Sequence, residues 1–161
     1  MVTSPRTFRT SSRTSERMAR VRRKDTPIEL ILRRAVWARG ARFRLHLQNV
    51  PGRPDFGNRR RRVAVFVDGC FWHGCPICRD FPTNNRRLWE QKFRYNRERR
   101  LKVRTVLERD GWTVVEVWGH EIWKNLEETA DRVAQALVEV DMAVMTSTKR
   151  RVSGRCAGGK A

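Results

Sequence analysis

The sequence predicts an α/β domain in which a mixed β-sheet is flanked by helices. Segments with helical hydrophobic spacing alternate with short apolar runs typical of strands, in the order α-β-β-α-β-α between residues 25 and 141. The chain has 161 residues, of which 39% are hydrophobic, including six Trp and seven Phe. This composition suffices for one hydrophobic core and excludes a fully disordered chain. Residues 1–24 and 142–161 are basic and lack hydrophobic periodicity, so we expect a basic N-terminal arm and a basic flexible tail.

The first half of the domain contains one predicted helix and two predicted strands. The helix begins at residues 26–29, TPIE, which have the pattern of a capping box with Pro at the first helical position, and it ends before Gly40. Residues 43–47 alternate between apolar and polar side chains, which indicates a strand. Residues 51–54, PGRP, predict a turn. Residues 62–68, RVAVFVD, form a short apolar run that predicts a central strand.

The second half begins with a cysteine-rich segment, residues 70–82, which has no regular period and predicts a loop. Residues 85–110 predict a long, very polar helix that ends at Gly111. Residues 113–118, TVVEVW, predict another strand, and residues 125 to about 140 predict the last helix.

The charge of the chain favours a polyanionic partner. There are 36 Lys and Arg against 17 Asp and Glu, so the formal net charge is +19. Nucleic acid is the first candidate, and a basic surface without function is the alternative. One face of the Arg-rich helix at residues 85–110 would contact phosphates. No stretch approaches the roughly 18 consecutive apolar residues of a membrane span, and the N-terminal residues lack the apolar run of a secretory signal.

Three of the four cysteines fall within nine residues: Cys70, Cys75 and Cys78. Clustered thiols without a secretory signal indicate metal ligands rather than a disulfide framework, and zinc is the expected ion. A structural zinc site usually has four ligands. His120 is favoured over His73 as the fourth, because a ligand beyond the last strand would tie the cysteine segment to a neighbouring element. Three buried, reduced thiols without a metal are the alternative.

Three acidic residues are candidates for a Mg²⁺ site. Asp55 follows a Pro, Asp68 ends an apolar run, and Glu29 lies in the first helix. Hard divalent cations prefer carboxylate oxygens, and phosphodiester hydrolysis uses such an ion to polarise the phosphoryl oxygen. Each acid also has a purely structural alternative: Asp55 as a turn residue, Asp68 as a strand-end residue and Glu29 as a helix-capping residue.

Two segments carry highly specific motifs, PGRPDF at residues 51–56 and VDGCFWHGC at residues 67–75. Further characteristic residues surround them: 18–26, Ile28, Glu29, Trp89, Lys92, Asn96, 111–114 and 117–121. Together they resemble the very short patch repair (Vsr) DNA mismatch endonucleases over about residues 15 to 140.

The resemblance implies a restriction-endonuclease-like fold with a structural zinc site, with residues 25–141 as the endonuclease domain. Members of this family nick the strand that carries T in a T:G mismatch, on the 5′ side of that T. Such mismatches arise when 5-methylcytosine deaminates. The resemblance therefore implies catalytic Mg²⁺, structural Zn²⁺ and double-stranded DNA with a T:G mismatch as the partner. It also implies a monomer in the bacterial cytoplasm, associated with the nucleoid.

By position, the resemblance also assigns roles to individual residues. It implies that Asp55 and the backbone carbonyl of Val67 hold Mg²⁺, that His73 is the general base or acid, and that Glu29 orients a metal-bound water or His73. The implied zinc ligands are Cys70, Cys75, Cys78 and His120. The implied DNA contacts are an aromatic wedge of Phe71 and Trp72, together with Trp89, Lys92 and Asn96.

The chain departs from the family pattern at two positions near these residues. Asp68 stands where His also occurs, so it either binds metal or assists proton transfer. Arg99 stands in a stretch where an acid is common, which would alter local substrate contacts. Two other functions compete with mismatch nicking: a related nicking or restriction-type endonuclease of other specificity, and a non-catalytic zinc-containing DNA-binding protein. The combination of Asp55, His73 and Glu29 favours an enzyme, because a pure binder does not need it.

Overall fold

The computed structural model describes residues 24–78 and 84–139, together with five residues before them: Ser12, Glu16, Ala19, Arg20 and Arg22. The expected tail at 142–161 and most of the expected arm at 1–24 lie outside the described residues. In chain order the described elements are α2 (Pro27–Ala38), β1 (Arg44–Leu45), β2 (Phe56–Asn58), β3 (Val63–Asp68), α3 (Cys70–His73), α4 (Arg86–Arg109), β4 (Thr113–Trp118), α5 (Gly119–Lys124) and α6 (Leu126–Glu139). No helix within this part of the chain has the length and apolar character needed to cross a membrane.

The strands form one mixed sheet in the order β1-β2-β3-β4. The β1–β2 and β2–β3 pairs are antiparallel, whereas β3 and β4 are parallel, with Val63 opposite Thr113 and Asp68 opposite Trp118. Two parallel neighbours need a long crossover, and α4 supplies it. The predicted mixed sheet flanked by helices is therefore confirmed.

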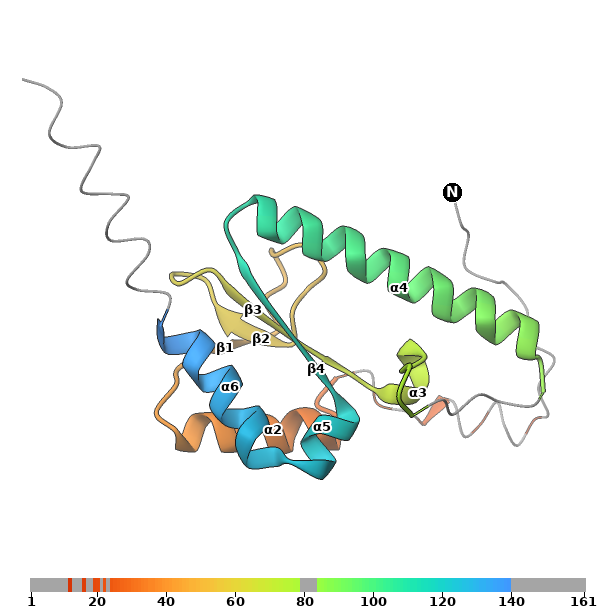
Figure 1. Cartoon of the computed structure of the whole chain (residues 1–161), viewed down its shortest axis with the longest axis horizontal. Helices are drawn as coiled ribbons and strands as arrows, with labels where there is room; N and C mark the ends of the chain where they lie inside the picture. The colour runs from red at the N-terminus through yellow and green to blue at the C-terminus, as the bar shows by residue number, and fades with distance from the viewer. Residues whose placement is uncertain are drawn as a thin grey trace, which may run out of the picture.

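Helices cover both faces of the central strand β3. On one face, Val65 and Val67 belong to a core shared with α2, α5 and α6. On the other face, Ala64 and Phe66 pack with Leu107 of α4. Figure 1 shows α4 running along one side of the sheet, with α2, α5 and α6 gathered on the other. All six residues of β3 are buried, which explains why this strand reads as a continuous apolar run rather than an alternating one.

Several elements differ from their sequence predictions. The strand expected at residues 43–47 pairs only at Arg44–Leu45. The cysteine-rich segment is not wholly irregular, because residues 70–73 form the short helix α3. Strand β2 and helix α5 were not predicted from the sequence. Strand β2 lacks a sequence signature because it has only three residues and one of them is a glycine, a residue that is uncommon in strands.

The ends of the long helices follow the predicted signals. Helix α4 lies between Asn85 and Asp110, and Gly111 follows with a φ of +78°. Helix α2 is followed by Gly40 with a φ of +81°. Both glycines supply the left-handed conformation that terminates a helix. The return of α4 places the carboxyl ends of β3 and β4 side by side, and α3 and α5 each begin directly after one of them.

Candidate active site and metal centre

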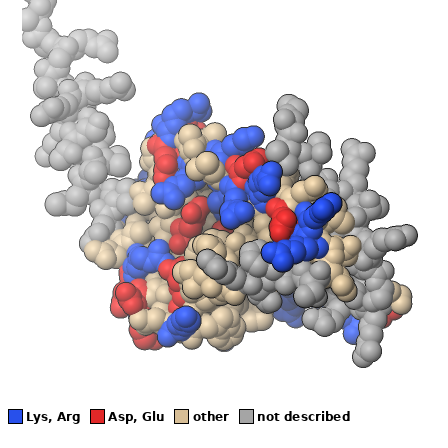
Figure 2. Space-filling view, turned by 45° about the vertical axis from the view of Figure 1, so that its right-hand side comes forward, with Lys and Arg blue, Asp and Glu red and all other residues tan. Residues whose placement is uncertain are grey.

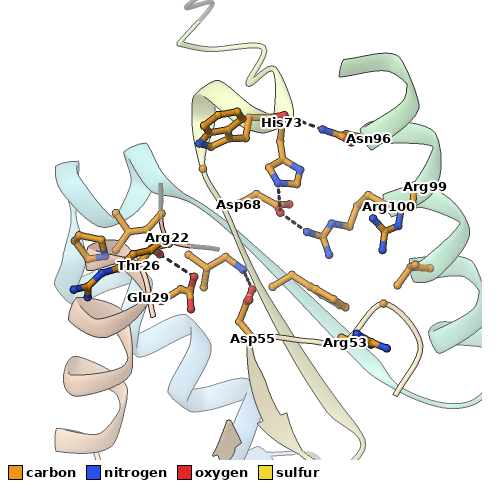
Figure 3. A pocket seen from close by; sticks show the side chains of 18 of the residues that line it. Arg22, Thr26, Glu29, Arg53, Asp55, Asp68, His73, Asn96, Arg99 and Arg100 are labelled. Carbon is orange, nitrogen blue, oxygen red and sulfur yellow. Dashed lines mark hydrogen bonds and ion pairs between the residues drawn. The ribbon is translucent and has the colours of Figure 1, made fainter. Parts of the chain in front are cut away.

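A cavity of about 830 Å³ lies at the carboxyl end of β3. Its walls come from the start of α2, the turn before β2, the end of β3 with α3, and one face of α4 (Figure 3). The polar side chains that line it include Thr26, Glu29, Arg53, Asp55, Asp68, His73, Asn96, Arg99 and Arg100. The three acids that the sequence singled out are thus brought together, although they are far apart in the chain.

Asp55 is anchored to the central strand. Its Oδ2 accepts a hydrogen bond of 2.8 Å from the backbone N–H of Val67. The pKa of the Asp55 carboxyl is raised to about 6. Burial is the main cause of this pKa shift and the charges of Glu29 and Asp68 contribute, while the Val67 N–H and Arg100 oppose the shift. A carboxylate destabilised by burial and by like charges fits a bound cation, because a cation would relieve both effects.

Asp68, His73 and Arg100 converge above Asp55 (Figure 3). The Nε2 atom of His73 lies 3.4 Å from Oδ1 of Asp68. The same oxygen accepts a hydrogen bond from Nη2 of Arg100. Burial lowers the pKa of His73, Asp68 opposes this shift, and Arg100 and Arg99 add to it. His73 is therefore neutral at neutral pH and faces the cavity with its proton-accepting capacity intact.

Glu29 is fixed by three donors at the start of α2. Its carboxylate accepts hydrogen bonds from Arg33 Nη2 at 2.7 Å, from the Thr26 hydroxyl at 2.8 Å and from the Asp25 backbone N–H at 3.1 Å. The capping-box prediction is wrong in its geometry, because Thr26 does not cap the helix backbone and donates to Glu29 instead. Arg33 was not among the site residues predicted from sequence; its i+4 spacing from Glu29 was the available signal.

Four potential metal ligands lie together beside the cavity: Cys70, Cys75, Cys78 and His120, with donor atoms all within 4.8 Å of one another. His120 Nδ1 is 3.3 Å from Cys70 Sγ and 3.5 Å from Cys75 Sγ. Zn–S and Zn–N bonds of about 2.3 and 2.0–2.1 Å in a tetrahedron require S···N separations of about 3.5 Å. The donor set therefore fits zinc, and the structure groups His120 with the cysteines while His73 faces Asp68.

An aromatic cluster covers the junction of α3 and α4. The ring of Phe71 lies 5.1 Å from Trp72 and 5.0 Å from Trp89. Lys92 Nζ lies 5.0 Å from the centre of the Trp89 ring and 5.5 Å from that of Trp72. Asn96 donates a 2.9 Å hydrogen bond to the backbone carbonyl of Trp72. Trp89 is 8% exposed, whereas Phe71 and Trp72 are half-buried, so Trp89 supports the other two rings from below.

The basic residues of α4 are divided between two environments. Figure 2 shows Lys and Arg side chains crowded on one part of the surface with Asp and Glu among them. Arg86 and Arg104 pair along the helix with Glu90 and Glu108, at 3.1 and 2.8 Å. By contrast, the cavity-lining face carries Lys92, Asn96, Arg99 and Arg100. Arg100 was predicted from sequence only as part of a basic helix; its position four residues after Asn96 was the only signal.

Comparison with known proteins identifies the family. Residues 7–79 match the family model described as DNA mismatch endonuclease Vsr. The type II nicking enzyme V.NaeI of Lentzea aerocolonigenes is 38% identical over 140 residues, covering 84% of this chain and 82% of the relative. V.NmeDIP of Neisseria meningitidis serogroup C is 38% identical over 120 residues, covering 71% and 78%. The DNA mismatch endonuclease Vsr of Escherichia coli K12 is 34% identical over 106 residues, covering 65% and 67%. The chain therefore belongs to the Vsr family and is a DNA endonuclease.

Proposed function

We propose that this protein is a Mg²⁺-dependent nicking endonuclease that cuts the T strand of a T:G mismatch on the 5′ side of the T. The observation that carries the proposal is the set of three acids that face one cavity beside His73: buried Glu29 and Asp68, and half-buried Asp55. In a chain with a net charge of +19, acids gathered at one point serve a cation rather than the surface. We also assign the domain to the restriction-endonuclease-like folds, as family membership implies; the mixed four-stranded sheet flanked by helices supports this assignment.

Asp55 and the backbone carbonyl of Val67 would hold Mg²⁺, which supplies charge stabilisation at the phosphoryl oxygen when bound. His73 is neutral and half-buried at the cavity wall, so it is suited to accept a proton from the attacking water. Glu29 is held by its three donors and orients a water or His73. We assign Asp68 to orienting His73 rather than to metal binding, because its carboxylate faces His73 and Arg100.

We assign Cys70, Cys75, Cys78 and His120 to a structural zinc ion. The ion would join α3 to α5, which follow neighbouring parallel strands. Helix α3 has only four residues, so it depends on such a crosslink for its position. Because α3 also carries His73, zinc would indirectly fix the catalytic histidine.

We assign Phe71 and Trp72 to an aromatic wedge that stacks on bases at the opened mismatch. Trp89 is buried, so we assign it to supporting the wedge instead of the DNA contact expected from sequence. Asn96 holds the backbone of Trp72, and Lys92 places a positive charge beside both indole rings.

The proposal is tested by strand cleavage of labelled duplexes with Mg²⁺, in which T:G mismatches in varied flanking sequence are compared with T:A and C:G pairs. We expect nicking of one strand at T:G alone, and loss of nicking in Asp55→Ala. Asp110→Ala is the matched control, because Asp110 lies at the far end of α4 and pairs with Arg109. Nicking of matched duplexes would instead support a related nicking endonuclease of other specificity. V.NaeI and V.NmeDIP are both named type II nicking enzymes.

The wedge is tested separately by Trp72→Ala. We expect Trp72→Ala to weaken binding to T:G duplexes about 5-fold or more, because base–aromatic stacking contributes about 1–3 kcal/mol per base. Trp37→Ala is the control, since Trp37 is 50% exposed but stacks with Arg42 and does not line the cavity. Equal effects of the two substitutions would contradict the wedge.

A further inference from the structure

The candidate active site must receive a phosphate although it is lined by carboxylates. Asp55, Asp68 and Glu29 all face the cavity, and each of them repels an incoming phosphodiester when ionised. A divalent cation on Asp55 offsets part of this repulsion. A fixed cation on the opposite wall would offset the rest and would hold the phosphate in register.

Arg100 is the cation best placed for this task. It lies on the cavity-lining face of α4, and its guanidinium sits over the ring of Phe66, with Cζ 4.2 Å from the ring centre. Figure 3 shows its guanidinium directed from α4 toward Asp68 and the space above Asp55.

The guanidinium of Arg100 is anchored but not saturated. Its Nη2 donates to Asp68. Its Nε lies 3.8 Å from Glu116, too far for a hydrogen bond, and makes no other hydrogen bond within the described part of the chain. No hydrogen bond from Nη1 to a described residue accompanies these contacts. An arginine has five N–H donors in a planar fork, so the Nη edge of Arg100 retains donors for a phosphate oxygen.

Arg104, one turn further along α4, provides a contrast. It pairs with Glu108 at 2.8 Å and with Glu116 at 3.6 Å, and its side chain is 47% exposed. It does not line the cavity. Two arginines of the same helix, both beside Glu116, thus differ in whether they face the site.

We propose that Arg100 is a catalytic residue of this endonuclease, which binds a non-bridging oxygen of the scissile phosphate while Asp68 holds its guanidinium toward the cavity. The inference rests on the proposed function, because that function defines the scissile step. Negative charge on the phosphate oxygens must be stabilised in the transition state, and a preorganised arginine donates charge-assisted hydrogen bonds to them. Asp68 would then have two partners with separate tasks, His73 and Arg100.

A binding cycle tests this contact directly. Affinity is measured, without added divalent cation, for a T:G duplex with a normal phosphodiester 5′ of the T and for the same duplex with an uncharged methylphosphonate there. The effect of this neutralisation is compared among the wild type, Arg100→Gln and Arg104→Gln. The change in affinity caused by the methylphosphonate should differ by about 10-fold or more between Arg100→Gln and the wild type. This is the magnitude expected for loss of a hydrogen bond to a charged group. Arg104→Gln should match the wild type, and an equal effect in all three proteins would overturn the proposal.

Nicking kinetics give a second readout. Single-turnover nicking with Mg²⁺ should fall about 100-fold or more in Arg100→Gln, the loss typical of removing one transition-state donor. Arg100→Lys keeps a positive charge beside Asp68, so it controls for misfolding caused by loss of that charge. It lacks the planar guanidinium, and its nicking rate should fall about 10-fold or more. A rate within twofold of the wild type for Arg100→Lys and Arg100→Gln would refute a phosphate contact. If the wild type nicks no T:G duplex, the proposed function fails. If the wild type nicks, but phosphate neutralisation changes the affinity of the wild type and of Arg100→Gln equally, only the role of Arg100 is refuted.

Discussion

Replacing Asp55 by Asn should make the metal-free protein more stable while abolishing its activity. The Asp55 carboxyl is buried beside two other acids, and its pKa is raised from 3.8 to about 6. The folded state therefore binds more protons than the unfolded state between these pH values, and the free energy of unfolding falls as pH rises through that window. Asn cannot ionise, so the variant escapes this loss.

The magnitude follows from the shift. The pKa of Asp55 is 3.8 in the unfolded chain and about 6 in the folded one. This difference lowers the free energy of unfolding by about 3 kcal/mol at pH 7.5 and by about 1.5 kcal/mol at pH 5. The Val67 N–H donates more strongly to a carboxylate than to an amide, but the pKa shift already includes that contribution. We therefore expect Asp55→Asn to raise the free energy of unfolding by about 2–3 kcal/mol at pH 7.5, and by roughly half as much at pH 5.

Urea denaturation followed by circular dichroism measures this difference at the two pH values, without added divalent cation. Asp110→Asn is the control, because Asp110 is half-exposed at the end of α4 and away from the acid cluster. Adding Mg²⁺ should raise the stability of the wild type and not that of Asp55→Asn. A variant less stable than the wild type at pH 7.5, or a gain that is the same at pH 5, would refute the electrostatic reasoning.

Three further predictions concern the surroundings of the site. Purified wild-type protein should contain about one zinc ion per chain by elemental analysis, and Cys75→Ser less than half of that, because one of four ligands is lost. Gly74→Ala should lower the free energy of unfolding by more than about 2 kcal/mol in urea, since φ is +60° and the new Cβ would lie 2.7 Å from the Phe93 ring. Gly40→Ala, at a φ of +81° with open space around it, should cost only about 1 kcal/mol, and equal losses would contradict the packing argument. Arg33→Met should lower the free energy of unfolding by about 3–5 kcal/mol in the same assay, because it removes the ion-pair partner of the buried Glu29 carboxylate. An unchanged free energy of unfolding would show that Glu29 is not ionised.

The regular elements with strong local signals were predictable from sequence. The helix at residues 86–109 lies between Asn85 and Gly111 as predicted, and β3 was recognised because strands covered on both faces are apolar at every position. Elements without such signals were missed. β2 has three residues and depends on its neighbours for hydrogen bonds, and α5 continues directly from β4 without a separating turn.

The chemistry-bearing residue types were also readable from sequence, because clustered cysteines and the PGRPDF and VDGCFWHGC motifs are local and specific. Their partners were not. Arg33 and Arg100 resemble ordinary basic residues of basic helices in the sequence. The i+4 spacing within one helix is the only signal for the Arg33–Glu29 pair, and only folding places Arg100 against Asp68. The sequence by itself thus determined which acids, thiols and rings are available. The tertiary structure decided which charges face each other, because the parallel pairing of β3 and β4 and the return of α4 bring together groups that are distant in the chain.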